Sequence, residues 1–544
     1  MPRLNTDTPF HAGELEAQAR VGVHDLAQRV KGFIRKYLPD QHRTFHTQLP
    51  FLIVAGADEA GKIWVTLIEG EEGFVQSPDP HHLKLNPVID ANDPLAQSFQ
   101  VGSHIGVLGI ELATRRRNRF SGYVRPDGNG FSIDISQTFG NCPQYIHPRH
   151  WSRDVRDDSP TVIQSAALTE AQVVQIEMAD TMFIGSGQMR EEDTPSSGYD
   201  ASHRGGEPGF VRVLDKNTLQ IPDYAGNNFF NTIGNLILNP KIGLLFIDFN
   251  SGSLLHITGK ASVEWAPPHP EKTGVLRLIN VEIDTVIERP QAIALRWTAQ
   301  QDSTMNLKLV KRTVESSTIT SFYFVSTDGR RLKPFKAGQH LPIEIRIPGD
   351  SNIVNRSYSL SSSPFDLSHY RISVKREEHG KASRYLHDEL KVGMQIITQP
   401  PSGDFNIPDK ESPLVLISAG VGLTPMVPML HQISNEKRQG WFIHGTQNST
   451  SHAIREEIYQ LIEHNDKLQQ IIYYSEPDKN DVIGQDYDIK GRITAEDLIG
   501  ICAEPSAHYL LCGPLTFIAE LQRGLEAAGV STDRIHFETF GSAN

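Results

Sequence analysis

The feature that most constrains the fold of this chain is a change of hydrophobic period in its C-terminal half. Residues 301–405 alternate apolar and polar side chains with a period of two, which is typical of antiparallel strands that bury one face. Ile343, Ile345 and Ile347, for example, fall on a single face. From residue 406 onward, short apolar runs alternate with helical segments, which is typical of a parallel, doubly wound sheet. The C-terminal half is therefore predicted to form a six-stranded antiparallel barrel followed by an α/β domain.

The α/β prediction depends on short apolar runs that alternate with segments of helical length. Strands are predicted at 413–418, 441–444, 471–474 and 509–512, and helices at 425–437, 451–463 and 514–528. Upstream of the barrel, the polar stretch 298–304 is the best candidate for a linker. The predicted domains are residues 1–300, 305–406 and 407–544.

The first domain contains a weak internal repeat. Three short motifs recur 136 or 137 residues later, those at 73–75, 105–108 and 121–122 reappearing at 209–211, 242–245 and 258–259. Three anchors in one register favour a duplicated unit over chance similarity, which is the alternative. Each copy has the pattern of two strands, a helix-like segment and a further strand pair. The first domain is therefore predicted to be a β-barrel built from two similar halves.

The charge of the chain excludes one class of partner. Its formal net charge is -13, so no overall basic field exists for nucleic acid or an anionic membrane surface. One basic run, Arg115 to Arg119, interrupts this pattern. Such a run could bind phosphate or a partner, but a solvated strand edge that blocks edge-to-edge pairing is the more common explanation.

The cysteine content and the apolar runs limit the cellular setting. Only three cysteines are present, Cys142, Cys502 and Cys512, so a disulfide framework is not expected. Three thiols also cannot supply the four ligands of a plant-type iron–sulfur cluster, and no other metal site is predicted. No signal sequence is recognisable, and no apolar run reaches the ~18 residues of a membrane span. A cytoplasmic protein with no membrane partner is expected.

A first group of candidate site residues lies in the predicted barrel. Arg356, Tyr358 and Ser359 share one strand, where alternation places Arg356 and Tyr358 on the same face. A guanidinium can bind a pyrophosphate through two parallel hydrogen bonds, and a phenol offers a flat apolar face with a donor. Downstream, Ser383 is predicted to cap a helix over 384–390 whose amides face an anion. An ordinary surface strand carrying the same residues is the alternative.

A second group lies where the first α/β strand meets its helix, in the loop 418–425. Gly420 and Gly422 let the backbone approach a phosphate without an intervening Cβ, and the helix N-terminus adds amide donors. The full dinucleotide fingerprint is absent, so an unremarkable strand–helix turn is the alternative.

The last two groups lie near the C-terminus. Cys512, Gly513 and Pro514 end a later parallel strand, and ligands of such sheets bind outside the carboxyl ends of the strands. A buried structural cysteine is the alternative for Cys512. In the tail, Phe540 could shield a cofactor face or simply fill the core.

In their order along the chain, these motifs resemble the ferredoxin–NADP reductase superfamily, with spacing closest to the reductase half of flavohaemoglobins. The resemblance covers residues 305–541. It implies FAD on the barrel, held by Arg356, Tyr358 and Ser359 with Lys375 and Ser383 nearby. It implies NAD(P)H on the α/β domain, with contacts at Gly420, Gly422, Thr424, Gly513 and Pro514. By the same resemblance, the residues beside the reacting rings are Cys512, Glu538 and Phe540.

Two points are left open by this resemblance. The sequence shows neither the globin that precedes this module in flavohaemoglobins nor a ferredoxin domain after it, so the electron acceptor is not identified. After the second α/β strand, residues 445–448 lack the cation that a 2′-phosphate requires. NADH is therefore favoured over NADPH.

The first domain resembles the pyridoxamine-phosphate-oxidase-like split barrels. The resemblance is carried by residues 180–184, 202–211, 221–227 and 231–240, with further characteristic stretches at 10–14 and 139–143. It implies FMN, with its phosphate held by Ser202 and Arg204 on a strand and by Asn231 and Thr232 on a helix. The last two depart from the Arg-Lys pair of the oxidases, so oxidation of pyridoxamine phosphate is not expected. Haem is the alternative ligand, with His203, His147 and His150 as candidate axial residues.

The whole sequence is interpreted as a flavin-dependent oxidoreductase. Hydride is expected to pass from NAD(P)H to FAD, and electrons on to FMN or to a small-molecule acceptor bound by the first domain. Two alternatives remain: a reductase that delivers electrons to a separate protein partner, and a flavin-binding redox sensor with negligible turnover. Because split barrels often complete their flavin site with two chains, a homodimer is expected from the resemblance.

Overall fold

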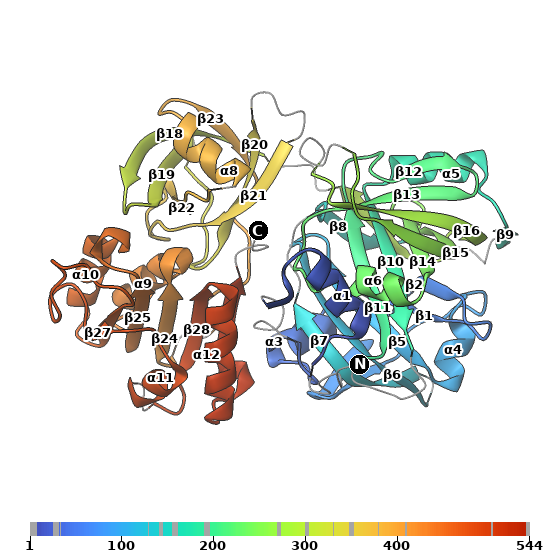
Figure 1. Ribbon diagram of the computed structural model, residues 1–544, viewed down its shortest axis with the longest axis horizontal. Coiled ribbons are helices and arrows are strands. Elements are labelled where there is room, and N and C mark those ends of the chain that lie inside the picture. Colours follow the sequence, from blue (N-terminus) through green and yellow to red (C-terminus); the bar gives the residue numbers. More distant parts are fainter. Residues whose placement is uncertain are drawn as a thin grey trace. The chain divides into compact units, whose positions relative to one another are not determined.

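The computed structural model describes two compact units, residues 1–300 and 301–540 (Figure 1). The residues that it leaves undescribed are 1–7, 26–31, 33, 129, 141–144, 155–160, 190–195, 269–273, 300–303, 330, 348–352, 379, 409–410, 502–503 and 540–544. The boundary between the units falls inside the polar stretch 298–304. Among the described helices, none combines the length and the apolar character needed to cross a bilayer.

The N-terminal unit contains two antiparallel sheets with the same strand order. The first sheet has the order β2-β1-β5-β6-β7-β4-β3, formed by β1 (Phe51–Ala57), β2 (Ile63–Glu69), β3 (Val75–Asp79), β4 (His82–Leu85), β5 (His104–Glu111), β6 (Arg116–Asp127) and β7 (Gly130–Gly140). The second has the order β11-β10-β14-β15-β16-β13-β12, formed by β10 (Thr181–Gln188), β11 (Gly198–Gly205), β12 (Arg212–Asp215), β13 (Thr218–Asp223), β14 (Lys241–Asp248), β15 (Ser253–Glu264) and β16 (Arg277–Arg289). A short strand, β9 (Ile163–Ser165), also pairs with β16, and β8 (Arg149–Arg153) pairs with β17 (Leu295–Ala299).

The strand registers show that the two sheets are copies of one arrangement. Val54 pairs with Val107 between β1 and β5, as Ile184 pairs with Leu244 between β10 and β14. The repeated sequence motifs occupy matching places in the two sheets. Gly122 lies opposite Ile105 on β5, and Gly259 lies opposite Ile242 on β14. The matching glycines also coincide with a register shift in each sheet. The internal repeat is therefore a repeat of structure as well as of sequence.

The helices of this unit cover the sheets and fix its N-terminal segment. They are α1 (Ala12–Arg20), α3 (Asp40–Thr47), α4 (Ala96–Val101), α5 (Glu170–Met178) and α6 (Asn231–Leu238). In Figure 1, α1 lies beside α6, where a Cβ added to Gly13 would come within 2.1 Å of the Gly234 carbonyl oxygen. The His11 side chain caps α1, and the Glu14 side chain completes a capping box by accepting a hydrogen bond from the His11 backbone amide. The two glycines let the helices approach closely and so bring Glu14 to α6.

The basic run at 115–119 is not on a sheet edge. Its strand, β6, lies between β5 and β7 in the middle of the first sheet. The interpretation of this run as an edge-blocking device is therefore wrong. Because side chains alternate along β6, Arg117 and Arg119 lie on the same face of the strand. Both contact residues of the second half of the unit, His203 and Asp200.

The second unit begins with the predicted antiparallel barrel. Its strands have the order β21-β20-β23-β18-β19-β22, formed by β18 (Met305–Val314), β19 (Ile319–Ser326), β20 (His340–Arg346), β21 (Ile353–Ser359), β22 (Tyr370–Lys375) and β23 (Gln395–Thr398). A bridge between Leu360 and Ile372 brings the two ends of the sheet together. Ile343 and Ile345 are 1% and 2% exposed, which confirms the alternation predicted for this strand.

The helix between β22 and β23 of the barrel differs from its prediction. The α-helix α8 (Lys381–Arg384) begins three residues earlier than expected and continues as a π-helical turn over Tyr385–Glu389. Ser383 therefore lies inside the helix and does not cap it. Its hydroxyl donates to the Gly380 carbonyl at 3.1 Å and accepts from the Glu377 amide at 3.2 Å, so it closes the preceding loop.

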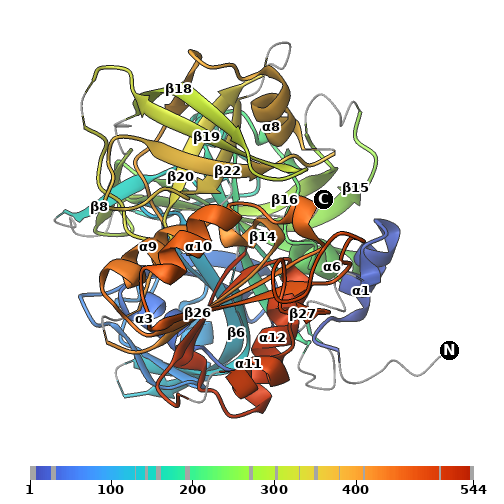
Figure 2. The same ribbon diagram turned by 90° about the vertical axis from the view of Figure 1, so that its left-hand side faces the viewer.

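The α/β domain has a parallel sheet covered by helices on both faces (Figure 2). The sheet order is β27-β26-β25-β24-β28-β29, formed by β24 (Leu414–Ala419), β25 (Gly440–Thr446), β26 (Leu468–Tyr474), β27 (Ile489–Lys490), β28 (His508–Gly513) and β29 (Ile535–Thr539). The helices are α9 (Met426–Asn435), α10 (Arg455–Glu463), α11 (Ala495–Ile501) and α12 (Leu515–Ala527). The four predicted strands are confirmed as parallel neighbours, whereas β27 and β29 were not predicted. The strand order reverses between β24 and β28, which is where such sheets bind ligands.

Candidate functional site

The loop after β24 forms a tight turn at the point where the strand order reverses. A 3-10 helix over Gly420–Leu423 follows the strand directly, and α9 begins at Met426 with Pro425 at its N-cap. No side chain caps α9, and its first two residues, Met426 and Val427, are fully buried. The turn also contacts β22 of the barrel. It therefore lies between the α/β sheet and the barrel of the same unit.

The two glycines of this turn have different physical roles. Gly420 has a φ of +55°, and a Cβ added there would meet nothing within 4 Å. A Cβ on Gly422 would instead lie 2.2 Å from the Cys512 carbonyl oxygen. Gly420 therefore presents bare backbone to open space, and Gly422 lets the turn rest on the end of β28. Such a surface of exposed backbone fits a dinucleotide phosphate.

Thr424 supports the turn from inside. It is 2% exposed, and its hydroxyl donates to the Val421 carbonyl at 3.1 Å. Thr424 therefore stabilises the turn, and its contact with the dinucleotide stays a prediction. Beneath the same turn, the Ser418 hydroxyl and His444 Nδ1 lie 2.9 Å apart, and burial lowers the pKa of His444 to about 3. A neutral His444 was not foreseen, because a histidine within a strand gives no signal of its surroundings.

Cys512 and Glu538 lie opposite each other on β28 and β29. Cys512 is fully buried, and this burial, with the charge of Glu538, raises the pKa of its thiol well above the usual range. Burial, reinforced by the charge of Asp404, raises the pKa of Glu538 to about 7. Glu538 can therefore hold or release a proton near neutral pH. Gly513 and Pro514 continue from Cys512 into the N-terminus of α12, and Phe540 lies outside the described residues.

The burial of Cys512 predicts an unreactive thiol. In the folded protein near neutral pH, Cys512 is expected to resist alkylation by iodoacetamide, because it is neither accessible nor ionised. Peptide mass spectrometry before and after unfolding distinguishes it from Cys142 and Cys502. Labelling of Cys512 in the native protein at the rate of an exposed cysteine would show that β28 opens readily.

The predicted barrel residues lie on adjacent strands. Arg356 is exposed on β21, with its guanidinium donating to the Asn355 carbonyl at 2.8 Å. Tyr358 is partly exposed on the same strand, and burial of its phenol raises its pKa to about 12, so the hydroxyl stays a hydrogen-bond donor. Ser359 is buried. Lys375 ends the neighbouring β22 and pairs with Glu377 at 2.9 Å. This set offers a cation, an aromatic face and donors, which fits an FAD pyrophosphate and ring.

A buried ion pair joins the barrel to the α/β domain. Arg371 on β22 donates to both carboxylate oxygens of Glu457 on α10, at 2.5 and 3.0 Å. His431 on α9 contacts the same carboxylate at 2.8 Å. Burial alone would raise the pKa of Glu457, but hydrogen bonds from His431 and Arg371 outweigh it and lower the pKa to about 2. The pair therefore fixes the two domains of this unit against each other. No local sequence pattern could have predicted it, because the partners are 86 residues apart.

The N-terminal unit contains a pocket whose lining includes four arginines and three aromatic side chains, which we call the cationic pocket. Its lining includes Ser202, Arg204, Asn231 and Thr232, all predicted to bind FMN, and His203, a candidate haem ligand. It also includes residues that were not assigned a role, namely Arg117, Arg119, Arg277, Tyr145, Tyr224 and Phe230. The Ser202 and Thr232 hydroxyls lie 3.0 Å apart. Tyr145 and Tyr224 stack at 5.2 Å to form an aromatic wall. The structure thus brings together residues from five separate segments of the sequence.

Carboxylates hold the arginines of the cationic pocket in place. Arg119 pairs with Asp200 at 3.1 Å, and Arg204 and Arg277 both pair with Asp223 at 2.6 Å. Within the described part of the chain, Arg119 Nε, Arg204 Nε and His203 Nε2 are buried without a hydrogen-bond partner. Buried donors without partners are costly, so a ligand with acceptor oxygens fits this pocket.

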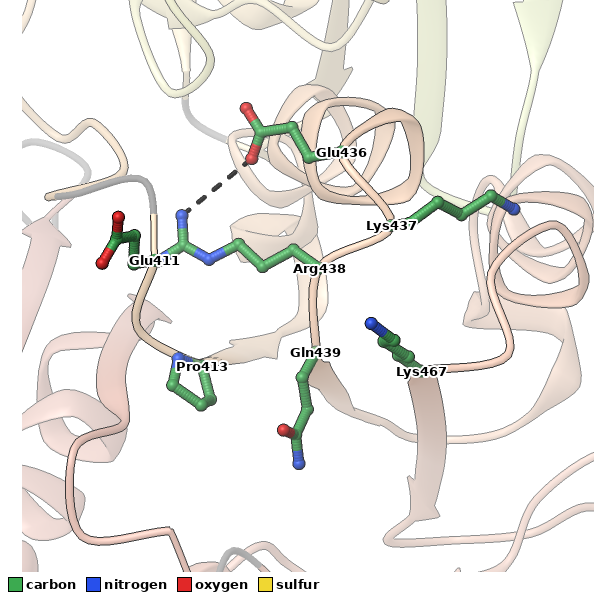
Figure 3. Close-up of a pocket in the computed structure, with 7 residues that line it drawn as sticks. All are labelled: Glu411, Pro413, Glu436, Lys437, Arg438, Gln439 and Lys467. Carbon is green, nitrogen blue, oxygen red and sulfur yellow. Dashed lines mark ion pairs between the residues drawn. The ribbon is translucent and has the colours of Figure 1, made fainter.

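A second hollow lies in the α/β domain. It is lined by residues at the amino ends of β24, β25 and β26, namely Glu411, Pro413, Glu436, Lys437, Arg438, Gln439 and Lys467 (Figure 3). Ligands of parallel sheets bind at the opposite, carboxyl edge. Charges of both signs line this hollow, and we assign it no role.

Comparison with known proteins identifies the second unit. Residues 306–407 match the model of an oxidoreductase FAD-binding domain, and residues 416–523 match that of an oxidoreductase NAD-binding domain. Residues 306–523 are an NAD(P)H-dependent oxidoreductase module. The predicted barrel and doubly wound sheet are thus confirmed as its FAD-binding and NAD-binding domains.

Similar proteins share this module. A flavohemoprotein of Bacillus cereus is 38% identical over 246 residues, which are 44% of this chain and 61% of the relative. A flavohemoprotein of Deinococcus radiodurans is 35% identical over 43% of this chain and 58% of its own length. The crystal structure of the FAD/NAD-binding domain of a Vibrio cholerae nitric oxide dioxygenase is 33% identical, with a TM-score of 0.40, and covers 44% of this chain and 99% of that domain. The chain therefore spans about three fifths of the curated relatives it matches.

Proposed function

We propose that this chain oxidises NADH through FAD bound on the barrel and delivers the electrons to a small-molecule acceptor at the N-terminal unit, where FMN binds in the cationic pocket. The observation that supports it most is the ordered pair of FAD-binding and NAD-binding domain matches. Hydride transfer from nicotinamide to flavin is the chemistry that the two cofactors supply when bound. The protein supplies position, charge and exclusion of water.

The residues of the second unit have distinct parts in this proposal. Arg356 and Tyr358 hold the FAD pyrophosphate and ring, and the exposed backbone at Gly420 receives the dinucleotide phosphate. Gly422 allows the turn to lie against Cys512, so that the nicotinamide reaches the strand ends beside Cys512 and Gly513. Glu538, with its pKa near 7, can hold a proton beside the reacting rings. The end of β25 and the two residues after it, Thr446 to Asn448, carry no cation, which favours NADH.

The proposal is tested on the purified protein. Cofactors are extracted, identified by mass and counted per chain, and NADH is then added without oxygen while flavin absorbance is followed. FAD together with FMN, both bleached by NADH, is the expected result. Absence of FAD, or failure of both NADH and NADPH to reduce it, would reject the proposal. A Soret band would identify haem in the N-terminal unit, and bleaching without steady turnover would indicate a sensor.

Replacing Arg356 tests the FAD site directly. Arg356→Met is expected to raise the dissociation constant for FAD roughly 10- to 100-fold, because a charge-assisted hydrogen bond contributes ~1.5–3 kcal/mol. Flavin fluorescence during equilibrium dialysis measures this constant. Arg346→Met, at an exposed position on β20 of the same barrel, is the matched control and should retain FAD. Equal FAD affinity in both variants would exclude Arg356 from the site.

A further inference from the structure

The repeated architecture of the N-terminal unit allows the cationic pocket to be compared with its own counterpart. Each half contributes equivalent strands, so the pocket residues on β6 and β11 have partner positions defined by strand register. Between β10 and β11, Ile184 pairs with Ser202, and between β1 and β2 the equivalent Val54 pairs with Thr66. The strands β6 and β15 correspond in the same way, because Leu108 pairs with Arg119 and Leu245 with His256.

These registers show that one copy of the site has lost its cations. The pocket residues Ser202, His203, Arg204, Arg117 and Arg119 correspond, in that order, to Thr66, Leu67, Ile68, Leu254 and His256. A hydroxyl is kept at the first position, but three arginines are replaced by Ile68, Leu254 and His256. All five counterparts are buried, none more than 4% exposed. The counterpart position is therefore filled with packed side chains.

The charge at the two positions also differs in sign. In the cationic pocket, four arginines face two carboxylates, those of Asp200 and Asp223, which leaves a formal charge of +2. At the counterpart, Arg289 meets both Asp93, at 2.5 Å, and Asp90, at 3.3 Å. The Thr66 hydroxyl also donates to Asp93. That cluster carries a formal charge of -1, so it does not suit an anion, although Arg289 Nε and His256 Nε2 are buried there without a hydrogen-bond partner within the described residues.

The cationic pocket itself is assembled from both halves. Arg117 and Arg119 come from the first half, on β6, and they contact His203 at 3.0 Å and Asp200 at 3.1 Å in the second half. Because Arg117 donates to His203 Nδ1, the remaining proton of a neutral His203 lies on Nε2. His203 thereby becomes a further buried donor without a partner within the described residues.

We propose that the N-terminal unit binds one phosphate-bearing ligand per chain, held by arginines from both halves, and that the counterpart site is closed. The first half thus takes the place that a second chain would occupy in a homodimer. The inference rests on the proposed function only in taking FMN as the ligand. It assigns Arg117 and Arg119, from the basic run, as phosphate-site residues.

The test compares matched substitutions at the two equivalent positions. FMN binding to the full-length protein with FAD bound is measured by isothermal titration calorimetry, with riboflavin, which lacks the phosphate, in parallel. One FMN per chain is expected, with riboflavin at least 10-fold weaker. Arg119→Gln should weaken FMN at least 10-fold and reduce the preference over riboflavin, whereas His256→Gln should change neither by more than about 2-fold. Arg204→Gln is the second variant, and melting temperatures confirm that each protein is folded.

Each outcome bears on one hypothesis. Two FMN per chain, equal effects of Arg119→Gln and His256→Gln, or no preference for FMN over riboflavin would overturn the inference. No FMN binding in a protein whose FAD is reduced by NADH would also overturn it, while the reductase function stands. One FMN per chain in a protein that NADH cannot reduce would instead overturn the proposed function and support the inference.

Discussion

Adding a single methyl group at Gly422 is expected to lower kcat/KM for NADH by ~100-fold or more, because the dinucleotide turn can no longer lie on the end of β28. The new Cβ would be 2.2 Å from the Cys512 carbonyl oxygen, 2.5 Å from the Cys512 carbonyl carbon and 2.8 Å from the Gly513 nitrogen. All three are backbone atoms of a central strand, so none can move aside as a flexible side chain would. The turn must shift instead, and with it the path of the nicotinamide.

The measurement is the anaerobic reduction rate of FAD at a series of NADH concentrations. The matched control is Gly500→Ala in α11 of the same domain, where an added Cβ meets nothing within 4 Å. This control should keep the wild-type rate. Thermal unfolding separates a displaced turn from an unfolded domain, since the barrel and its FAD remain as an internal reference. A Gly422→Ala variant with wild-type kcat/KM would show that the turn does not position NADH.

The second large effect is expected from Glu457→Gln, which removes the charge that joins the two domains of the second unit. The Arg371 side chain is 7% exposed and would keep its charge without a counterion. Breaking a fully buried pair from one side costs ~3–5 kcal/mol, and because the Glu457 side chain is 30% exposed, we expect a smaller cost, roughly 2–3 kcal/mol. The free energy of unfolding, from urea titration, measures this loss. Glu456→Gln, exposed on the same helix, should change it by less than ~0.5 kcal/mol.

The pH dependence of this effect has a definite sign. The pKa of Glu457 is lowered from its ordinary 4.5 to about 2 in the folded protein. A carboxyl group whose pKa is lower in the folded than in the unfolded state stabilises the fold. This stabilisation is complete above the unfolded pKa and is lost as the pH falls toward the folded pKa. The difference in unfolding free energy between wild type and Glu457→Gln should therefore be constant above about pH 5 and shrink between about pH 4.5 and pH 2. A difference that grows on acidification would contradict the ion-pair account.

The local sequence already predicted the elements that depend on short-range order. Alternation of apolar residues predicted the barrel strand with Ile343 and Ile345, and continuous apolar runs predicted β24, β25, β26 and β28. Prediction from the local sequence failed where an element depends on contacts with distant residues. The strand β29 reads Ile-His-Phe-Glu-Thr, which lacks a continuous apolar run, and only its place beside β28 makes it a strand. Ser383 has the chemistry of a cap, but the helix begins before it.

The sequence by itself determined the order and type of the domains and the chemistry available in the second unit, because hydrophobic period and glycine placement act over a few residues. Tertiary structure alone decided which side chains meet. It placed β6 inside a sheet, so that Arg117 and Arg119 line the same pocket as Ser202 and Arg204. It also paired Arg371 with Glu457 across a domain boundary. Such contacts join residues 80 or more positions apart, and their geometry follows from how whole sheets pack, which no local pattern encodes.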